Sequence, residues 1–255
     1  MYSLLHQLLS DKKGGTVFTC FGLWHFLYLA VFLAVIAGLL LWLRGKSAET
    51  RRQVADGAIA FSFCLYIADF FLMPFAYGAI DLEKLPFHAC TATCVLCFIA
   101  RRQPRMEKLR LPLTLLALAS NLIYVIYPAG VGWQQIHPLS YRVMQTLLYH
   151  GSMTAYGVLY LASREARLTW KTCCRTLPVI TAMTLWAMLG NALYNGTADG
   201  YDHFFNWFFV VRDPFYLLPA DIAPYIMPFV MVLVMFTAVT LIYGASQVIR
   251  KLVRQ

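Results

Sequence analysis

The apolar run FTCFGLWHFLYLAVFLAVIAGLLLWL at residues 18–43 is followed directly by the connector RGKSAETRRQ at residues 44–53. The run contains no Lys, Arg, Asp or Glu and exceeds the roughly 20 residues that a transmembrane helix needs. The connector holds four cations, Arg44, Lys46, Arg51 and Arg52. Cationic connectors stay on the cytoplasmic side because their translocation is unfavourable. This stretch therefore predicts a membrane-spanning helix whose C-terminal end faces the cytoplasm.

The rest of the chain repeats this arrangement. Further apolar runs occupy residues 54–77, 85–100, 109–127, 139–162, 176–194 and 221–245. The later connectors alternate, with one Lys or Arg in 78–84, five in 101–110, none in 128–138, four in 163–175 and one in 195–220. The tail, 246–255, has three. We predict an all-α, polytopic membrane bundle of seven transmembrane helices, a single domain over residues 1–255, with the N-terminus outside and the C-terminus cytoplasmic.

The composition agrees with this class of protein. Hydrophobic residues make up 60% of the chain and charged residues 13%, against about a quarter in soluble domains. The net charge of +9 does not indicate a nucleic-acid partner, because the cations lie in short loops that meet anionic lipid headgroups. Membrane lipids are the expected partners.

A few polar side chains lie inside the predicted spans, where they are costly and indicate function. Counted from the span ends, Asp69, Cys90 and His150 all lie in the outer half of the bilayer. Helical spacing places Thr146, His150 and Thr154 on one stripe, typical of a helix that lines a cavity or packs closely.

A thiol and an imidazole at similar depth suggest nucleophilic catalysis, in which a carboxylate orients the His. Cys90 also lies near a helix start, which favours the thiolate, whereas burial opposes it. On a regular helix His88 faces away from Cys90, so His88 supports the site from a distorted turn or hydrogen-bonds to the outer loops. A zinc site with Cys94 as a further ligand lacks any recognised spacing, and we expect no metal and no cofactor.

The connector at 195–220 is unusually aromatic. It opens with a glycosylation sequon, Asn195-Gly196-Thr197, and continues through the run FFNWFFVV at residues 204–211. That run is too short to span a membrane, and Trp and Phe favour the headgroup boundary. We expect it either to roof an outward cavity or to anchor the loop at the interface.

Two short motifs carry a family resemblance. Leu85-Pro86-Phe87-His88-Ala89-Cys90 and, in a later span, Tyr149-His150-Gly151 resemble the YwaF-like membrane proteins, whose eukaryotic relative is transmembrane protein 164. A looser match covers Asn191, Asn195 and Asp213-Pro214.

The resemblance implies a seven-helix bundle and acyl transfer into ether phospholipids, with a phospholipid or lysophospholipid as substrate. It also implies that Cys90 is the nucleophile and His150 the general base, with Asn191 in a supporting role. Tyr149 stands where the family usually has a small residue.

Two other classes of function remain open from the residues alone. A transporter or proton-coupled solute-binding protein would use Asp69 and His150 along a polar path, although neither repeat symmetry nor broken helices are evident. A retinal receptor would need a Lys in the last span, and residues 222–244 contain none. A scaffold role is the remaining alternative.

Overall fold

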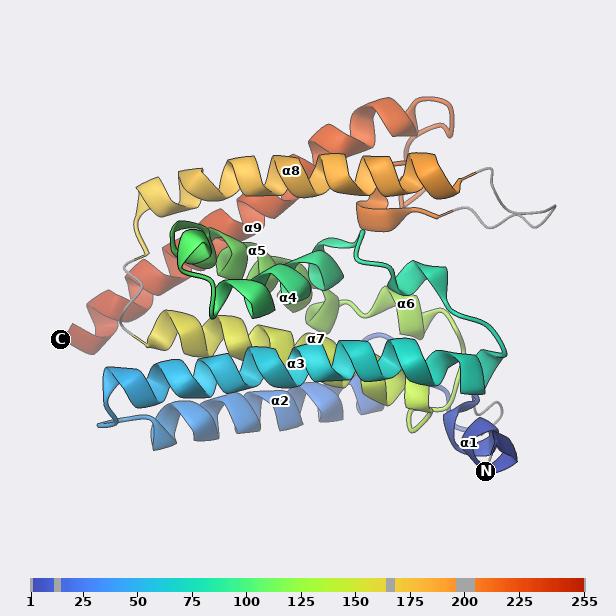
Figure 1. The fold of residues 1–255 in the computed structure, drawn as a ribbon, viewed down its shortest axis with the longest axis horizontal. Coiled ribbons are helices and arrows are strands. Elements are labelled where there is room, and N and C mark those ends of the chain that lie inside the picture. The colour runs from blue at the N-terminus through green and yellow to red at the C-terminus, as the bar shows by residue number, and fades with distance from the viewer. Residues whose placement is uncertain (1, 12–14, 164–167, 196–204, 255) are drawn as a thin grey trace. The chain divides into compact units, whose positions relative to one another are not determined.

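The computed structural model describes residues 2–11, 15–163, 168–195 and 205–254. Within these residues the protein is entirely helical and contains no strand (Figure 1). The chain divides into two compact units. Unit 1 comprises residues 1–82 and 120–167, and unit 2 comprises residues 83–119 and 168–255. The single domain over residues 1–255 stays a prediction.

A helix occupies each of the seven predicted spans. These helices are α2 (Leu23–Trp42), α3 (Ala48–Tyr77), α4 (Ala89–Ala100), α5 (Glu107–Ile126), α7 (Tyr141–Ala162), α8 (Trp170–Tyr194) and α9 (Ala223–Arg254). The sequence did not indicate the short helices α1 (Tyr2–Leu9) and α6 (Ala129–Gly132), nor the 3-10 turns η1 (Leu82–Lys84), η2 (Pro104–Met106) and η3 (Trp207–Phe209).

Five helical segments of the described chain are long and apolar enough to cross a membrane. They are Leu23–Trp42, Ala48–Phe75, Pro104–Gly132, Trp170–Tyr194 and Ala223–Ile249. Helix α7 has 22 residues but is less apolar, and α4 has only 12 residues. The seven spans and the orientation of the termini therefore stay predictions.

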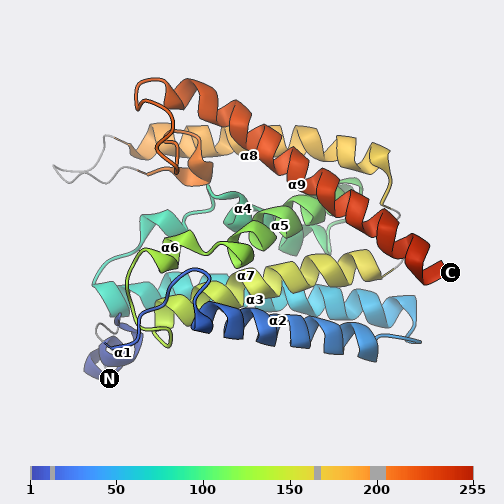
Figure 2. The same cartoon turned by 180° about the vertical axis from the view of Figure 1, so that it is seen from behind.

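In unit 1, α2, α3 and α7 run side by side, and α3 packs most extensively against α7 (Figures 1 and 2). The Ser62 hydroxyl on α3 hydrogen-bonds to the Ser152 hydroxyl on α7, at 2.8 Å. The His25 side chain on α2 is fully buried. Its Nδ1 accepts the Phe21 N–H and its Nε2 lies 3.0 Å from the Val125 carbonyl oxygen, so His25 joins α2 to the end of α5.

In unit 2, α8 and α9 pack along each other beside a cluster of aromatic rings. The Phe87 ring lies 5.0 Å from the Trp186 ring and 4.9 Å from the Trp207 ring, between centroids. The Phe205 and Trp207 rings are stacked at 4.4 Å. Gly190 on α8 allows the Phe87 ring to approach the helix backbone.

The aromatic run in the connector between α8 and α9 is mostly covered by protein. Trp207 and Phe208 are buried in the core of unit 2, and Phe204 lies outside the described residues. Phe209 within the run is exposed, and the more strongly exposed apolar residues follow at Phe215 and Leu217. Most of the described aromatic run therefore packs into the core of unit 2, and its role at the membrane interface stays a prediction.

Asp213 holds the turn that displays these later residues. Its carboxylate accepts the backbone N–H groups of Phe215, Leu217 and Leu218 at 2.8, 2.8 and 3.0 Å. These hydrogen bonds, chiefly that of Phe215, lower the pKa of Asp213 below its ordinary value.

Replacing Gly190 by Ala is expected to destabilise unit 2. The new Cβ would overlap the Phe87 ring, which Trp186 and Trp207 prevent from moving aside. Overpacking of this kind costs about 1–3 kcal/mol. Thermal unfolding in detergent measures the effect. In the control Gly244→Ala on α9 the Cβ meets nothing within 4 Å, so that variant should be as stable as wild type or more so. Equal stability of the two variants would contradict the packing described here.

The Asp213 turn should open in acid. Because its folded pKa is lowered, the carboxylate's stabilisation is complete above the ordinary Asp pKa of about 4 and is lost as the pH falls through the lower folded value. We expect amide-exchange protection of Leu217 and Leu218 at pH 6 and much less at pH 2–3. Asp213→Asn should remove protection at both pH values, since one amide oxygen cannot satisfy three donors. Asp221→Asn serves as the matched control and should change nothing.

Candidate functional site

The motif LPFHAC at residues 85–90 joins the start of α4 to α8 and to the aromatic cluster of unit 2. The Pro86 carbonyl accepts the Trp186 indole N–H at 2.7 Å, and the Phe87 ring enters the aromatic cluster. Ala89, the first residue of α4, is buried. These contacts position the residue that follows, Cys90.

His88 lies outside the helix rather than within it. It is the N-cap of α4, with extended backbone dihedrals, so the helical spacing used to place it opposite Cys90 does not apply. Its Nδ1 accepts the backbone N–H of Phe208 at 3.1 Å. Of the two alternatives expected for His88, this contact matches the hydrogen bond to the connector at 195–220.

Asn191 holds the same loop from the other side. Its Oδ1 accepts the Trp207 N–H at 3.0 Å, and its Nδ2 donates to the carbonyls of Trp207 and Ala187 at 3.1 and 2.8 Å. Asn195 makes an equivalent pair of hydrogen bonds with the backbone of Phe205. Its side-chain amide is thus engaged within the protein, while Gly196 and Thr197 of the sequon lie outside the described residues.

Cys90 is the second residue of α4 and is partly exposed, whereas Cys94 and Cys97 are fully buried on the same helix. The first main-chain hydrogen bond of the helix is donated by Ala92 to His88. The backbone N–H groups of Cys90 and Thr91, which precede that first bond, lie beside the Cys90 sulfur.

His150 of unit 1 is buried on α7 and has a defined orientation. Its Nδ1 lies 2.7 Å from Oδ1 of Asn121, and its ring stacks on Tyr124 at 3.9 Å between centroids and 15° between planes. A carboxamide oxygen can only accept a hydrogen bond, so the proton resides on Nδ1. In the neutral ring Nε2 then carries the lone pair that can take up a proton.

The other predicted residues of unit 1 are buried and take part in hydrogen bonds. Asp69 on α3 accepts the phenol O–H of Tyr141 at 2.9 Å. The Thr154 hydroxyl donates to the His150 carbonyl at 2.8 Å, and the Thr146 hydroxyl to Oε1 of Gln145 at 3.4 Å. Asp69, Thr146, Thr154 and His150 thus belong to unit 1, and His88, Cys90 and Asn191 to unit 2.

Sequence reasoning missed Asn121, the partner of the His150 Nδ1. The search for costly groups inside spans was confined to ionisable side chains, and a carboxamide also needs partners in an apolar setting. Applied to every polar side chain in residues 109–127, the same criterion would have selected Asn121. No group of three or more His, Cys, Asp or Glu side chains among the described residues is placed to hold a metal ion.

Several long apolar helices with exposed apolar side chains define an integral, multi-pass membrane protein. The chain belongs to the TMEM164 family, whose family model matches residues 20–245. This confirms the family resemblance carried by the two motifs. Searches of curated proteins and of solved structures find no significant match.

The role of Asn121 can be tested on the imidazole of His150. In wild-type protein, ¹⁵N spectra of the ring should show the Nδ1–H tautomer, and Asn121→Ala should produce a mixture of tautomers or of ring orientations. Asn121→Asp should retain Nδ1–H because a carboxylate also accepts. Asp69→Asn, which alters a group bonded to Tyr141, is the control and should leave the His150 signals unchanged. Unchanged signals in Asn121→Ala would disprove this assignment.

Proposed function

We propose that this protein is a lipid acyltransferase of the membrane, in which Cys90 is the nucleophile and His150 the general base. The acyl group would pass from a membrane phospholipid to Cys90 and then to a lysophospholipid hydroxyl. The TMEM164 family membership supports this reading, since the resemblance implies acyl transfer with these two residues.

The observation that carries the proposal is the hydrogen bond from His150 Nδ1 to Asn121. A histidine whose Nδ1–H is held by an acceptor presents Nε2 as a proton acceptor, as in enzymes with a Cys–His–Asn arrangement. The stacked Tyr124 ring limits rotation of the imidazole. Together these contacts give the His150 ring the fixed orientation and the tautomer that a general base requires.

The position of Cys90 gives a second line of support. The residue is partly exposed, whereas Cys94 and Cys97 on the same helix are buried. Backbone N–H groups at a helix start also suit an oxyanion that forms next to the sulfur.

The reaction would proceed in two balanced transfers. His150 Nε2 takes the Cys90 thiol proton, and the thiolate attacks the ester carbonyl carbon of the donor phospholipid. The ester C–O bond then breaks, the leaving alkoxide receives the proton from His150, and the acyl group remains on Cys90 as a thioester. His150 next deprotonates the acceptor hydroxyl, which attacks the thioester and releases the Cys90 thiolate, which is reprotonated by His150.

The remaining predicted residues would act as positioning groups. In unit 2, His88 and Asn191 hold the loop residues Phe208 and Trp207 against the start of α4. In unit 1, Asp69 would hold Tyr141 at the outer end of α7, and Thr154 bonds to the His150 carbonyl.

The proposal includes all seven membrane crossings, with the N-terminus outside. If α4 did not cross, the five cations of residues 101–110 would join residues 78–84 on the outer side. Likewise, if α7 did not cross, the four cations of residues 163–175 would join the uncharged connector at 128–138. Both arrangements would place cation-rich connectors outside, against the preference for cytoplasmic Lys and Arg that the other connectors follow.

Acyl transfer can be tested with the full-length protein in nanodiscs that contain a phospholipid with an alkyne-tagged acyl chain. We expect a tagged, hydroxylamine-labile adduct on Cys90 and tagged product when lysophospholipid is added. Cys90→Ala should abolish both, and His150→Ala should slow the transfer by about 10²–10⁴-fold.

Cys64→Ala is the matched control, because Cys64 is exposed and lies in the other unit. It should behave like wild type. An adduct or product that persists in Cys90→Ala would overturn the proposed mechanism, and the absence of both in folded wild-type protein would overturn the function.

A further inference from the structure

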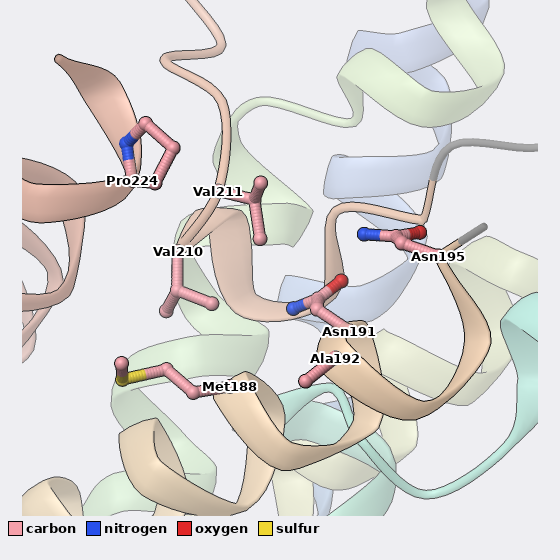
Figure 3. A pocket seen from close by; sticks show the side chains of 7 residues that line it. All are labelled: Met188, Asn191, Ala192, Asn195, Val210, Val211 and Pro224. Atoms are coloured by element: carbon pink, nitrogen blue, oxygen red, sulfur yellow. The ribbon is translucent and has the colours of Figure 1, made fainter. Parts of the chain in front are cut away.

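A hollow of about 290 Å³ lies at the C-terminal end of α8. It is lined by Met188 and Ala192 of α8 together with Val210, Val211 and Pro224. Figure 3 shows these side chains around an open space. All of them belong to unit 2.

The polar side chains beside the hollow form hydrogen bonds within the protein. Asn191 and Asn195 also border it, yet both amide hydrogens of Asn191 are donated to carbonyl oxygens and its Oδ1 accepts the Trp207 N–H. The Asn195 amide is paired with the backbone of Phe205. The remaining lining is apolar, so the hollow suits an apolar occupant.

The location of the hollow indicates where that occupant comes from. Helix α8 is a candidate membrane span, and Leu189 and Leu193 on it are about half exposed. Met188 both lines the hollow and is 39% exposed. The hollow is therefore continuous with the apolar surface of α8, which in a membrane is covered by hydrocarbon chains.

We propose that this hollow is a lipid-binding pocket that holds one acyl chain of a membrane glycerolipid. A chain there would lie against Val210, which follows η3, and against Asn191, which hydrogen-bonds to Trp207 of η3. The same turn is bonded through Phe208 to His88, two residues before Cys90. The inference depends on membrane embedding and on the pocket, and it stands whether or not Cys90 transfers acyl groups.

Photolabelling can separate a bound chain from ordinary lipid contact. The full-length protein is placed in nanodiscs with increasing fractions of a phosphatidylcholine that bears a diazirine on its acyl chain, and labelled residues are mapped by mass spectrometry. Labelling of Met188, Ala192 and Val210 should saturate and be competed by untagged lipid. Labelling of Leu189 and Leu193 should rise linearly with the probe.

Filling the pocket should remove the saturable labelling. Ala192→Phe is expected to reduce labelling of Val210 by roughly tenfold or more, since the ring occupies the space of the chain. Met188→Trp, at the exposed rim, is a second filling variant that is less disruptive to folding. Leu193→Phe, on the lipid-facing side of α8, is the matched control and should retain wild-type labelling.

Near-UV circular dichroism confirms that each variant keeps the packing of the aromatic cluster. Linear labelling of Val210 with probe fraction, unchanged in both filling variants, would overturn the proposal. It would mean that the hollow contacts only exchanging bulk lipid. Acyl transfer is measured separately, so its loss or retention does not affect this result.

Discussion

The paired hydrogen bonds between the Asn191 side chain and the Trp207 backbone organise the part of unit 2 around the start of α4. A connector packed among apolar helices cannot leave its main-chain groups without partners. A carboxamide meets this constraint well because it offers one donor and one acceptor side to a peptide group. His88 extends the pairing by accepting the next N–H, from Phe208. The start of α4, and with it Cys90, is thereby tied to the connector between α8 and α9.

Unit 1 uses a carboxamide for a different purpose. Asn121 binds the imidazole of His150 rather than a peptide group, and Tyr124 covers the ring. The Asn121 side chain favours the Nδ1–H tautomer of His150. The Asn191 side chain instead stabilises the backbone conformation at Trp207. The two asparagines thus illustrate how neutral side chains can fix geometry inside a membrane protein without the desolvation cost of a charge.

Much of this could be predicted from the sequence, and the limits have physical causes. Length and hydropathy located a helix in each of the seven predicted spans, because apolar runs report directly on burial in lipid or protein. The roles of Cys90 and His150 stay predictions, and the bond of His88 to the connector between α8 and α9 matches one of the two alternatives expected for it. A wider count of polar side chains in the spans would have selected Asn121, but its pairing with His150, 29 residues away in the chain, depends on tertiary packing. The burial of Trp207 was not predicted, because an aromatic run looks the same whether lipid or protein covers it.

Helix α7 shows why hydropathy alone is a poor test of whether a helix with buried polar side chains crosses a membrane. A high mean hydropathy reflects apolar side chains, which a helix needs where it faces lipid, as in α2 with a mean hydropathy of 2.3 and few buried residues. In α7 the polar side chains Thr146, His150 and Thr154 are all buried, so they are screened from lipid by protein. Its 22 residues give about 33 Å of helix, enough for the hydrocarbon core. A helix that carries the polar residues of a membrane-embedded site must lower its own hydropathy, so the charge pattern of its flanking connectors is the better guide to whether it crosses.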